Sequence, residues 1–374
     1  MNLESLLGSA DELLAIASTA DRPDERRRAL DYVLDFVGPG FTVERFEAGG
    51  SPSALLYAGG GGGARPEFRV IFNAHLDVVP GDPGQFAPRR DGDRLYARGA
   101  QDMKVSALVL ARVFAELAPV LPYPIGLQLV TDEEVGGHHG TRHQLDQGVT
   151  GRFVVIGEYS ALRVVTESKG LVNLRLHAKG RAGHSAYPWL GDNALVTLNR
   201  TLNAVLDAYP VPDGEVWRTT VNVARIETPN EAYNQIPARA TAWLDVRYPP
   251  EDADLPGRTP AQIAKHFASF CVPGTTVEIG AVAPPHRADP ESAEVSALQR
   301  AARAEGHSGD FLRKHGAADA RFYYQDGIDA VIFGVGGDGQ HGPDEYVDVR
   351  TIEPYYRALT RFLRDLPAGP RPDH

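Results

Sequence analysis

Cysteine is nearly absent from the sequence, with Cys271 the single example in 374 residues. One thiol cannot form an intrachain disulfide, and it cannot build a zinc site of the CxxC type. Because Cys271 lies in the apolar segment HFASFCVPG, we expect it to be an unreactive core residue. Histidine and carboxylate side chains are therefore the candidate metal ligands.

Long apolar runs and basic tracts are also missing. No apolar stretch approaches the roughly 18 residues that a membrane span needs. The N-terminal segment MNLESLLGSADELLAIAS carries acidic residues where a secretory signal has basic ones. With 38 Lys+Arg against 49 Asp+Glu, the net charge of −11 argues against nucleic-acid or anionic-membrane partners. We expect a soluble cytoplasmic protein.

The sequence alternates between strand and helix patterns on both sides of a different central region. Up to residue 169, apolar runs such as FRVIFNAH, PIGLQLVT and RFVVIGE alternate with helical segments such as VSALVLARVFAELA, and the pattern returns after 282. This alternation predicts an α/β catalytic domain, a largely parallel mixed sheet flanked by helices. A chain of this length is also expected to form two domains.

Between residues 170 and 281 the strands alternate apolar and polar residues, and the elements follow the order βαββαβ. That order is typical of a small α+β domain of the ferredoxin-like type. We therefore predict one domain from residues 1–169 and 282–374, with residues 170–281 inserted into it. The glycine run 59–63 and the tail 368–374 are expected to lack regular structure.

Histidine and carboxylate side chains follow several predicted strands, where functional groups of α/β proteins gather. They occur in five segments: NAHLDVVPGD (His75, Asp77), YARGAQDMK (Asp102), TDEEVGG (Glu133, Glu134), VVIGEYS (Glu158) and GGDGQHGPDE (His341). Such ligands suit zinc, manganese or cobalt. Two histidines and three carboxylates are too many for one tetrahedral ion and fit two ions that share a carboxylate.

Two details sharpen this hypothesis. Asp77 lies two residues after His75, on the same face of an extended backbone, where its carboxylate can orient the imidazole. Glu133 and Glu134 point to opposite sides of an extended backbone, and their charges repel unless a cation lies nearby. Taken singly, each segment also fits an ordinary strand-end histidine or a solvated acidic turn. The five segments together indicate a metal site more specifically than any one of them does.

The motifs HLDVVP, RGAQDMK, DEEVGG, GHSAYPWLGDNA, NQIPARATAWLDVR and HGPDE resemble those of the dinuclear zinc deacylases and exopeptidases. This family includes aminoacylase, acetylornithine deacetylase, succinyl-diaminopimelate desuccinylase and glutamate carboxypeptidase, and the resemblance covers nearly the whole chain. It implies that Asp102 bridges two metal ions. His75 and Glu158 then complete one metal site, and Glu134 and His341 complete the other.

The resemblance also implies roles for residues that bind no metal. Glu133 becomes the general base that deprotonates the attacking water and later protonates the leaving amine. His184 donates a hydrogen bond to the oxyanion across a dimer interface. Arg247 and Asn234 hold the substrate's carboxylate, with Lys169 as a further basic residue. The ordinary alternatives are a surface-loop histidine at position 184 and an exposed cross-strand arginine at position 247.

The function that the resemblance implies is hydrolysis of N-acyl amino acids, such as acetyl or succinyl derivatives, with two divalent ions, zinc before cobalt or manganese. The alternative is a dipeptidase or carboxypeptidase of the same family. A homodimer through residues 170–281 is also implied. Two alternatives belong to other functional classes: an inactive binding protein on the same scaffold, and a nicotinamide-dependent oxidoreductase. The second rests on GVGGDG at 334–339, but QHGPDEYVDV after it is not helical, as that motif requires.

Overall fold

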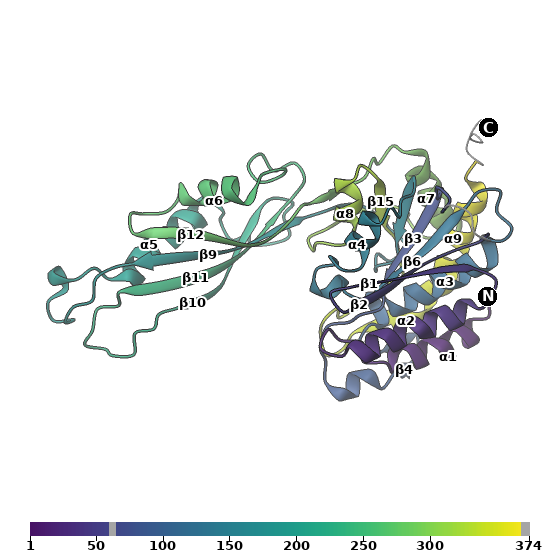
Figure 1. Ribbon diagram of the computed structural model, residues 1–374, viewed down its shortest axis with the longest axis horizontal. Helices are drawn as coiled ribbons and strands as arrows, with labels where there is room; N and C mark the ends of the chain where they lie inside the picture. The colour runs from purple at the N-terminus through teal and green to yellow at the C-terminus, as the bar shows by residue number, and fades with distance from the viewer. Residues whose placement is uncertain (60–64, 368–374) are drawn as a thin grey trace. The chain divides into compact units, whose positions relative to one another are not determined.

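A computed structural model describes residues 1–59 and 65–367 (Figure 1). The predictions for residues 60–63 of the glycine run and for the tail 368–374 lie outside the described residues. The chain divides into a larger unit (Met1–Thr166, Arg287–Arg313 and Ala318–His374) and a smaller one (Glu167–His286 and Lys314–Ala317). Among the described residues, no helix is both long and apolar enough to cross a membrane.

The larger unit is built on a mixed sheet. Its strands run in the order β1 (Thr42–Ala48), β2 (Ser51–Tyr57), β6 (Ile125–Val130), β3 (Val70–His75), β7 (Phe153–Ile156), β15 (Asp329–Ile332) and β8 (Val164–Ser168). The four strands β6, β3, β7 and β15 are parallel, whereas β1 and β2 pair antiparallel at one edge. The prediction of a largely parallel mixed sheet is confirmed. Two short strands, β13 (His286–Arg287) and β14 (Phe311–Lys314), pair with β8.

Helices cover both faces of this sheet (Figure 1). One face carries α1 (Leu3–Leu14), α2 (Pro23–Val37), α3 (Val105–Leu117), α7 (Ala293–Ala304) and α9 (Ile352–Asp365), and the other carries α4 (Thr141–Asp146) and α8 (Ala320–Gln325). Because both faces are covered, the central strands β3, β6 and β7 are buried at every position and are mostly apolar, as the sequence runs indicated.

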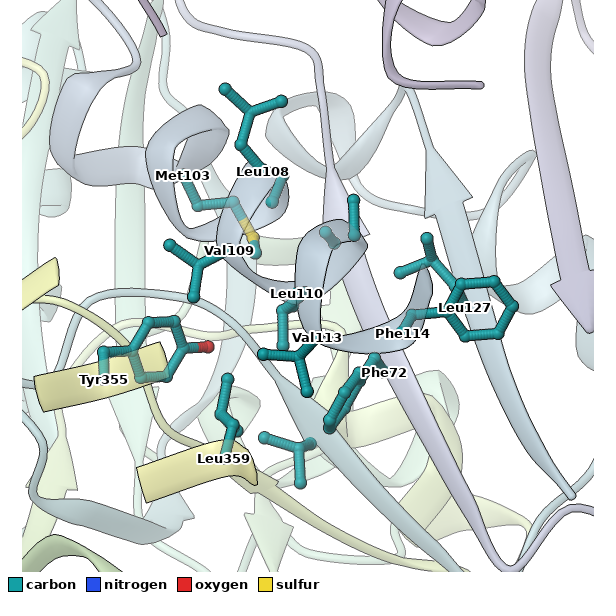
Figure 2. Close-up of a cluster of buried hydrophobic side chains, with 14 of the residues drawn as sticks. Phe72, Met103, Leu108, Val109, Leu110, Val113, Phe114, Leu127, Tyr355 and Leu359 are labelled. Atoms are coloured by element: carbon teal, nitrogen blue, oxygen red, sulfur yellow. The ribbon is translucent and has the colours of Figure 1, made fainter. Parts of the chain in front are cut away.

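Strand β3 shows how the alternation of side chains builds two cores. Phe72 belongs to the cluster formed with the long helices, whereas its neighbour Ile71 belongs to the cluster beneath α4 and α8. Figure 2 shows Phe72 among Val113 and Phe114 of α3 and Leu359 of α9. Burial of each such side chain contributes about 1.5–3 kcal/mol. This packing fixes the strand that ends at His75.

A second, small sheet brings two distant loops together. It pairs β16 (Gly337–Asp338), β17 (Tyr346–Asp348), β5 (Arg94–Tyr96) and β4 (Arg89–Asp91) in that order, all antiparallel. The loop with His341 joins β16 to β17, and the segment with Asp102 follows β5. GVGGDG thus contains β16 and is followed by β17 instead of the helix that a dinucleotide site requires.

The smaller unit is a four-stranded antiparallel sheet with helices on one face. Its elements are β9 (Gly170–Lys179), α5 (Ala194–Ala208), β10 (Thr220–Glu227), β11 (Arg239–Tyr248), α6 (Pro260–Ala268) and β12 (Thr275–Ala283). The strand order is β10-β11-β9-β12, and alternate residues of β9 pack beneath α5 and α6. The predicted βαββαβ order is confirmed.

Candidate active site

The carboxyl ends of three adjacent parallel strands carry four of the predicted site residues, His75, Glu133, Glu134 and Glu158. His75 is the last residue of β3, and it pairs in register with Val130 at the end of β6. Glu133 and Glu134 follow β6 in a short 3-10 turn, and Glu158 follows β7 by two residues. Because these strands are neighbours in one sheet, their ends bring the imidazole and the carboxylates together.

Asp102 and His341 reach the same place from the loops held by the small sheet. Nε2 of His75 lies 2.9 Å from Oδ1 of Asp102. Nε2 of His341 lies 3.5 Å from the other oxygen, Oδ2, and 3.2 Å from Oε2 of Glu134. The Asp102 carboxylate therefore faces one histidine with each oxygen, which is the arrangement that a bridging ligand needs.

Two groups of three side chains in the described part of the chain place their ligand atoms within 4.8 Å of one another: His75 with Glu133 and Glu158, and His75 with Asp102 and Glu134. The second group combines His75, a predicted ligand of one ion, with Glu134, a predicted ligand of the other, and with Asp102, which is predicted to bind both. The first contains Glu133, for which we predicted a role as base. Glu133 thus lies at the distance from His75 and Glu158 that either a base or a ligand requires.

The electrostatics of this cluster show a shortage of positive charge. Burial and the nearby Glu158 raise the pKa of Glu133 well above its usual value, and burial also raises the pKa of Glu134. Burial opposes charging of His75, but Asp102 and Asp77 raise its pKa well above the usual value. Hydrogen bonds with Asp102 and Glu134 raise the pKa of His341 to about 10.

Protons bound to these groups therefore reduce the repulsion between the carboxylates, and a cation would reduce it more effectively. A divalent ion replaces them with fixed positive charge, and nitrogen and carboxylate oxygen are suitable ligands for zinc-type metals. The donor set fits a metal site.

Asp77 has a broader role than the sequence suggested. Nδ1 of His75 lies 3.0 Å from the backbone oxygen of Asp77 and 3.6 Å from its carboxylate oxygen Oδ1. The carboxylate accepts hydrogen bonds from the amides of Glu133 (3.2 Å) and Glu134 (3.0 Å). Asp77 thus fixes both the imidazole and the turn that holds the two glutamates.

Two buried residues beside the same turn, Arg321 and Asp319, were not predicted from the sequence. Arg321 donates to the carbonyl of Gly136 at 2.8 Å, and Asp319 raises the pKa of Glu133 by its negative charge. A side chain at Gly137 would come within 2.1 Å of Asp319, so this position requires glycine. The segment AADARF offered no local signal of this contact, because α8 lies far from the turn in sequence.

Tyr159 and Gln340 form a further contact with the cluster. The amide nitrogen of Gln340 donates to Oδ2 of Asp102, and the Tyr159 hydroxyl donates to the amide oxygen of Gln340. Tyr159 directly follows the predicted ligand Glu158, and Gln340 directly precedes the predicted ligand His341. The two loops are therefore connected beside Asp102.

The remaining predicted residues belong to the smaller unit, where the structure brings His184 and Asn234 together. The amide of Ser185 donates to the Asn234 carbonyl at 3.0 Å, and His184 forms a β-bridge with Gln235. Nδ1 of the exposed His184 accepts a hydrogen bond from the Ala186 amide at 3.1 Å. The neutral imidazole therefore carries its proton on Nε2, which is a hydrogen-bond donor.

The side chains of Arg247 and Lys169 both form hydrogen bonds within the smaller unit. Arg247 donates from Nε and Nη2 to the two carboxylate oxygens of Asp245, at 2.6 and 3.0 Å, and its side chain is 35% exposed. Lys169 is buried, and Nζ donates to the Arg218 carbonyl at 2.6 Å. Burial lowers the pKa of Lys169. The structure thus places Arg247 at a surface and Lys169 in the interior.

Comparison with known proteins gives concordant matches. The model of peptidase family M20/M25/M40 matches residues 71–365. A succinyl-diaminopimelate desuccinylase of Acidiphilium cryptum is 28% identical, covering 95% of this chain and 98% of that one. The enzyme of the same name from Sphingopyxis alaskensis is 37% identical, covering 56% and 59%. A tripeptidase structure from Staphylococcus aureus shares the fold, with a TM-score of 0.78, 18% identity, and coverage of 97% and 98%.

Proposed function

The chain belongs to peptidase family M20/M25/M40, and on that premise we propose that it hydrolyses the amide bond of N-acyl amino acids. The observation that carries the proposal is the convergence of imidazole and carboxylate groups at the ends of β3, β6 and β7, where they lack positive charge. The two relatives named succinyl-diaminopimelate desuccinylase support an acylated amino acid as the substrate.

Two divalent ions, zinc first among them, would be held by His75, Asp102, Glu134, Glu158 and His341. Asp102 would be the shared ligand, because its two oxygens lie near different histidines. When bound, such ions lower the pKa of a water molecule and polarise the substrate carbonyl. Asp77 keeps the His75 ring and the Glu133–Glu134 turn in place.

Glu133 is the group that moves the proton. Its carboxyl belongs to the cluster, and the hydrogen bond from its backbone amide to Asp77 helps to hold the turn that carries it. It accepts a proton from the attacking water and gives it to the leaving nitrogen, which departs as a free amine.

His184, Asn234 and Arg247 are our candidates for binding the substrate. Nε2–H of His184 is the donor for the oxyanion that forms at the carbonyl, and its tautomer supports this role. Arg247 would bind the substrate carboxylate through Nη1, which takes no part in its pair with Asp245, or by exchanging that partner. The substrate role of Lys169 stays a prediction, and its buried position favours a structural role.

We place the inserted domain, residues 170–281, at a homodimer interface, with His184 acting in the partner's site. A mixture of Glu133→Gln and His184→Ala subunits tests this arrangement. If His184 acts across the dimer, each mixed dimer has one intact site, and activity returns to about a quarter of the wild-type value. If His184 acts in its own subunit, every site lacks one residue and activity does not return. Sedimentation velocity reports the oligomeric state.

The test of the function is a substrate panel assayed after chelation and metal restoration. N-acetyl and N-succinyl amino acids are expected to be cleaved, and dipeptides and C-terminal peptide bonds much more slowly. Faster cleavage of peptides would favour the dipeptidase or carboxypeptidase alternative, which the family description supports. Absence of all these activities from the metal-loaded protein would overturn the proposal. The cytoplasmic location stays a prediction, which cell fractionation can check.

A further inference from the structure

A buried ion pair links the two chain segments that carry Asp102 and His341. Arg98 stands four residues before Asp102, and Glu345 stands four residues after His341. Nη1 of Arg98 lies 2.5 Å from Oε2 of Glu345, and the two side chains are 4% and 1% exposed. A buried pair of this kind is stable only where further hydrogen bonds satisfy its other polar atoms.

Glu345 supplies those hydrogen bonds to the segment with Asp102. Its second oxygen, Oε1, accepts from the amides of Gly99 at 3.0 Å, Gln101 at 3.1 Å and Asp102 at 3.2 Å. A single carboxylate oxygen therefore fixes the backbone of the turn from which the Asp102 side chain projects. Hydrogen bonds to a charged acceptor are stronger than neutral ones, so this turn is firmly held.

Arg98 makes the corresponding contacts with the opposite segment. Its Nη2 donates to the carbonyl of His341 at 3.1 Å and to that of Gly342 at 3.2 Å. Each member of the pair thus belongs to one segment and binds the backbone of the other. The distance between Asp102 and His341 depends on this reciprocal contact.

We propose that Arg98 and Glu345 are positioning residues for metal binding. By holding Asp102 and His341 at a fixed separation, they determine the affinity of the ion that these residues share with Glu134. The inference rests on the two-ion centre of the proposed function. The other ion shares Asp102, but its remaining ligands, His75 and Glu158, lie at the ends of β3 and β7 in the main sheet, so that ion depends on the pair less.

The test is Glu345→Gln, which keeps the size of the side chain and one carbonyl oxygen but removes the charge opposite Arg98. Chelator-stripped protein is titrated with cobalt(II), and binding is followed by calorimetry and visible absorption. We expect the affinity for one ion to fall about 10- to 100-fold, as for other partners of metal ligands, and that for the other to stay within about threefold. A high cobalt concentration should restore activity.

The matched control is Glu278→Gln. Glu278 pairs with Arg175 at 2.9 Å, but both side chains lie at the surface of the smaller unit. This variant should bind both ions as the wild type does. Unchanged binding in Glu345→Gln, or equal weakening of both ions, would overturn the inference.

If circular dichroism shows that Glu345→Gln does not fold, Arg98→Lys decides by the same criteria, because lysine keeps the charge and loses the two-pronged geometry. Failure of the proposed function gives a different result. Wild-type protein would then bind two ions yet cleave nothing on the substrate panel, and the titration would still report on the pair.

Discussion

Replacing Glu133 with glutamine separates proton transfer from metal binding. The variant keeps the size of the side chain, and the hydrogen bond from its backbone amide to Asp77 does not depend on the carboxyl group. Loss of a general base lowers the rate about 10²- to 10⁴-fold, which corresponds to roughly 3–5 kcal/mol of activation free energy. Metal content should remain that of the wild type, because the proposed ligands are unchanged.

The same substitution should stabilise the metal-free protein. Ligand atoms of Glu133 and Glu158 lie within 4.8 Å of one another. At that distance two unit charges repel by about 3 kcal/mol for an effective dielectric constant of about 20. Protonation of Glu133 already relieves part of this repulsion, so we expect a gain of about 1–3 kcal/mol in the free energy of unfolding. Bound metal ions neutralise the cluster, and the gain should then shrink.

The assay combines turnover with excess zinc, elemental analysis and melting curves with and without chelator. The control is Glu47→Gln, since Glu47 forms only a surface ion pair with Arg27, and it should change none of these quantities. More than about a tenth of wild-type turnover in Glu133→Gln would refute the assignment of the base. Loss of bound metal would instead identify Glu133 as a ligand.

Three further predictions concern stability. Phe72→Ala removes a side chain that is 1% exposed, and it should cost about 3–5 kcal/mol in chemical denaturation; a loss below about 1 kcal/mol would contradict the packing of β3. Chelation should lower the melting temperature, and added zinc or cobalt should restore it, because only the folded chain presents the whole ligand set; an unchanged melting curve would argue against a metal site. The hydrogen bond from Arg65 lowers the pKa of Glu44, so this pair stabilises the fold above the ordinary glutamate pKa and loses its effect as the pH falls. Glu44→Gln should therefore cost up to about 1 kcal/mol at neutral pH and nothing measurable near about pH 3, and an equal cost at both would exclude the ionic contribution.

Much of the site was predictable because its residues follow recognisable local patterns. His75 ends a continuous apolar run, and Glu133 and Glu134 follow another, so their strands could be identified without the fold. Their convergence follows from the rule that parallel strands end at one edge of the sheet. The βαββαβ order of the smaller unit was readable for the same reason, since alternation of polar and apolar residues is a local property.

The supporting residues were not predictable in this way. Arg98 and Glu345 stand within motifs that we quoted, but their contact joins positions 247 residues apart. Arg321 reaches Gly136 from α8, across 185 residues. Lys169 matched a basic position of the family, yet its surroundings bury it. Such contacts depend on burial and distance in the folded chain, which local patterns do not encode.

The sequence by itself therefore determined the types of element, their order and the chemical nature of the ligands, because these depend on neighbouring residues. Only the tertiary structure decided which carboxylates share a buried space, that Asp102 faces two histidines, and that the pKa values of Glu133 and Glu134 rise. Proximity and loss of solvent, which arise when distant segments meet, are the physical cause of these properties.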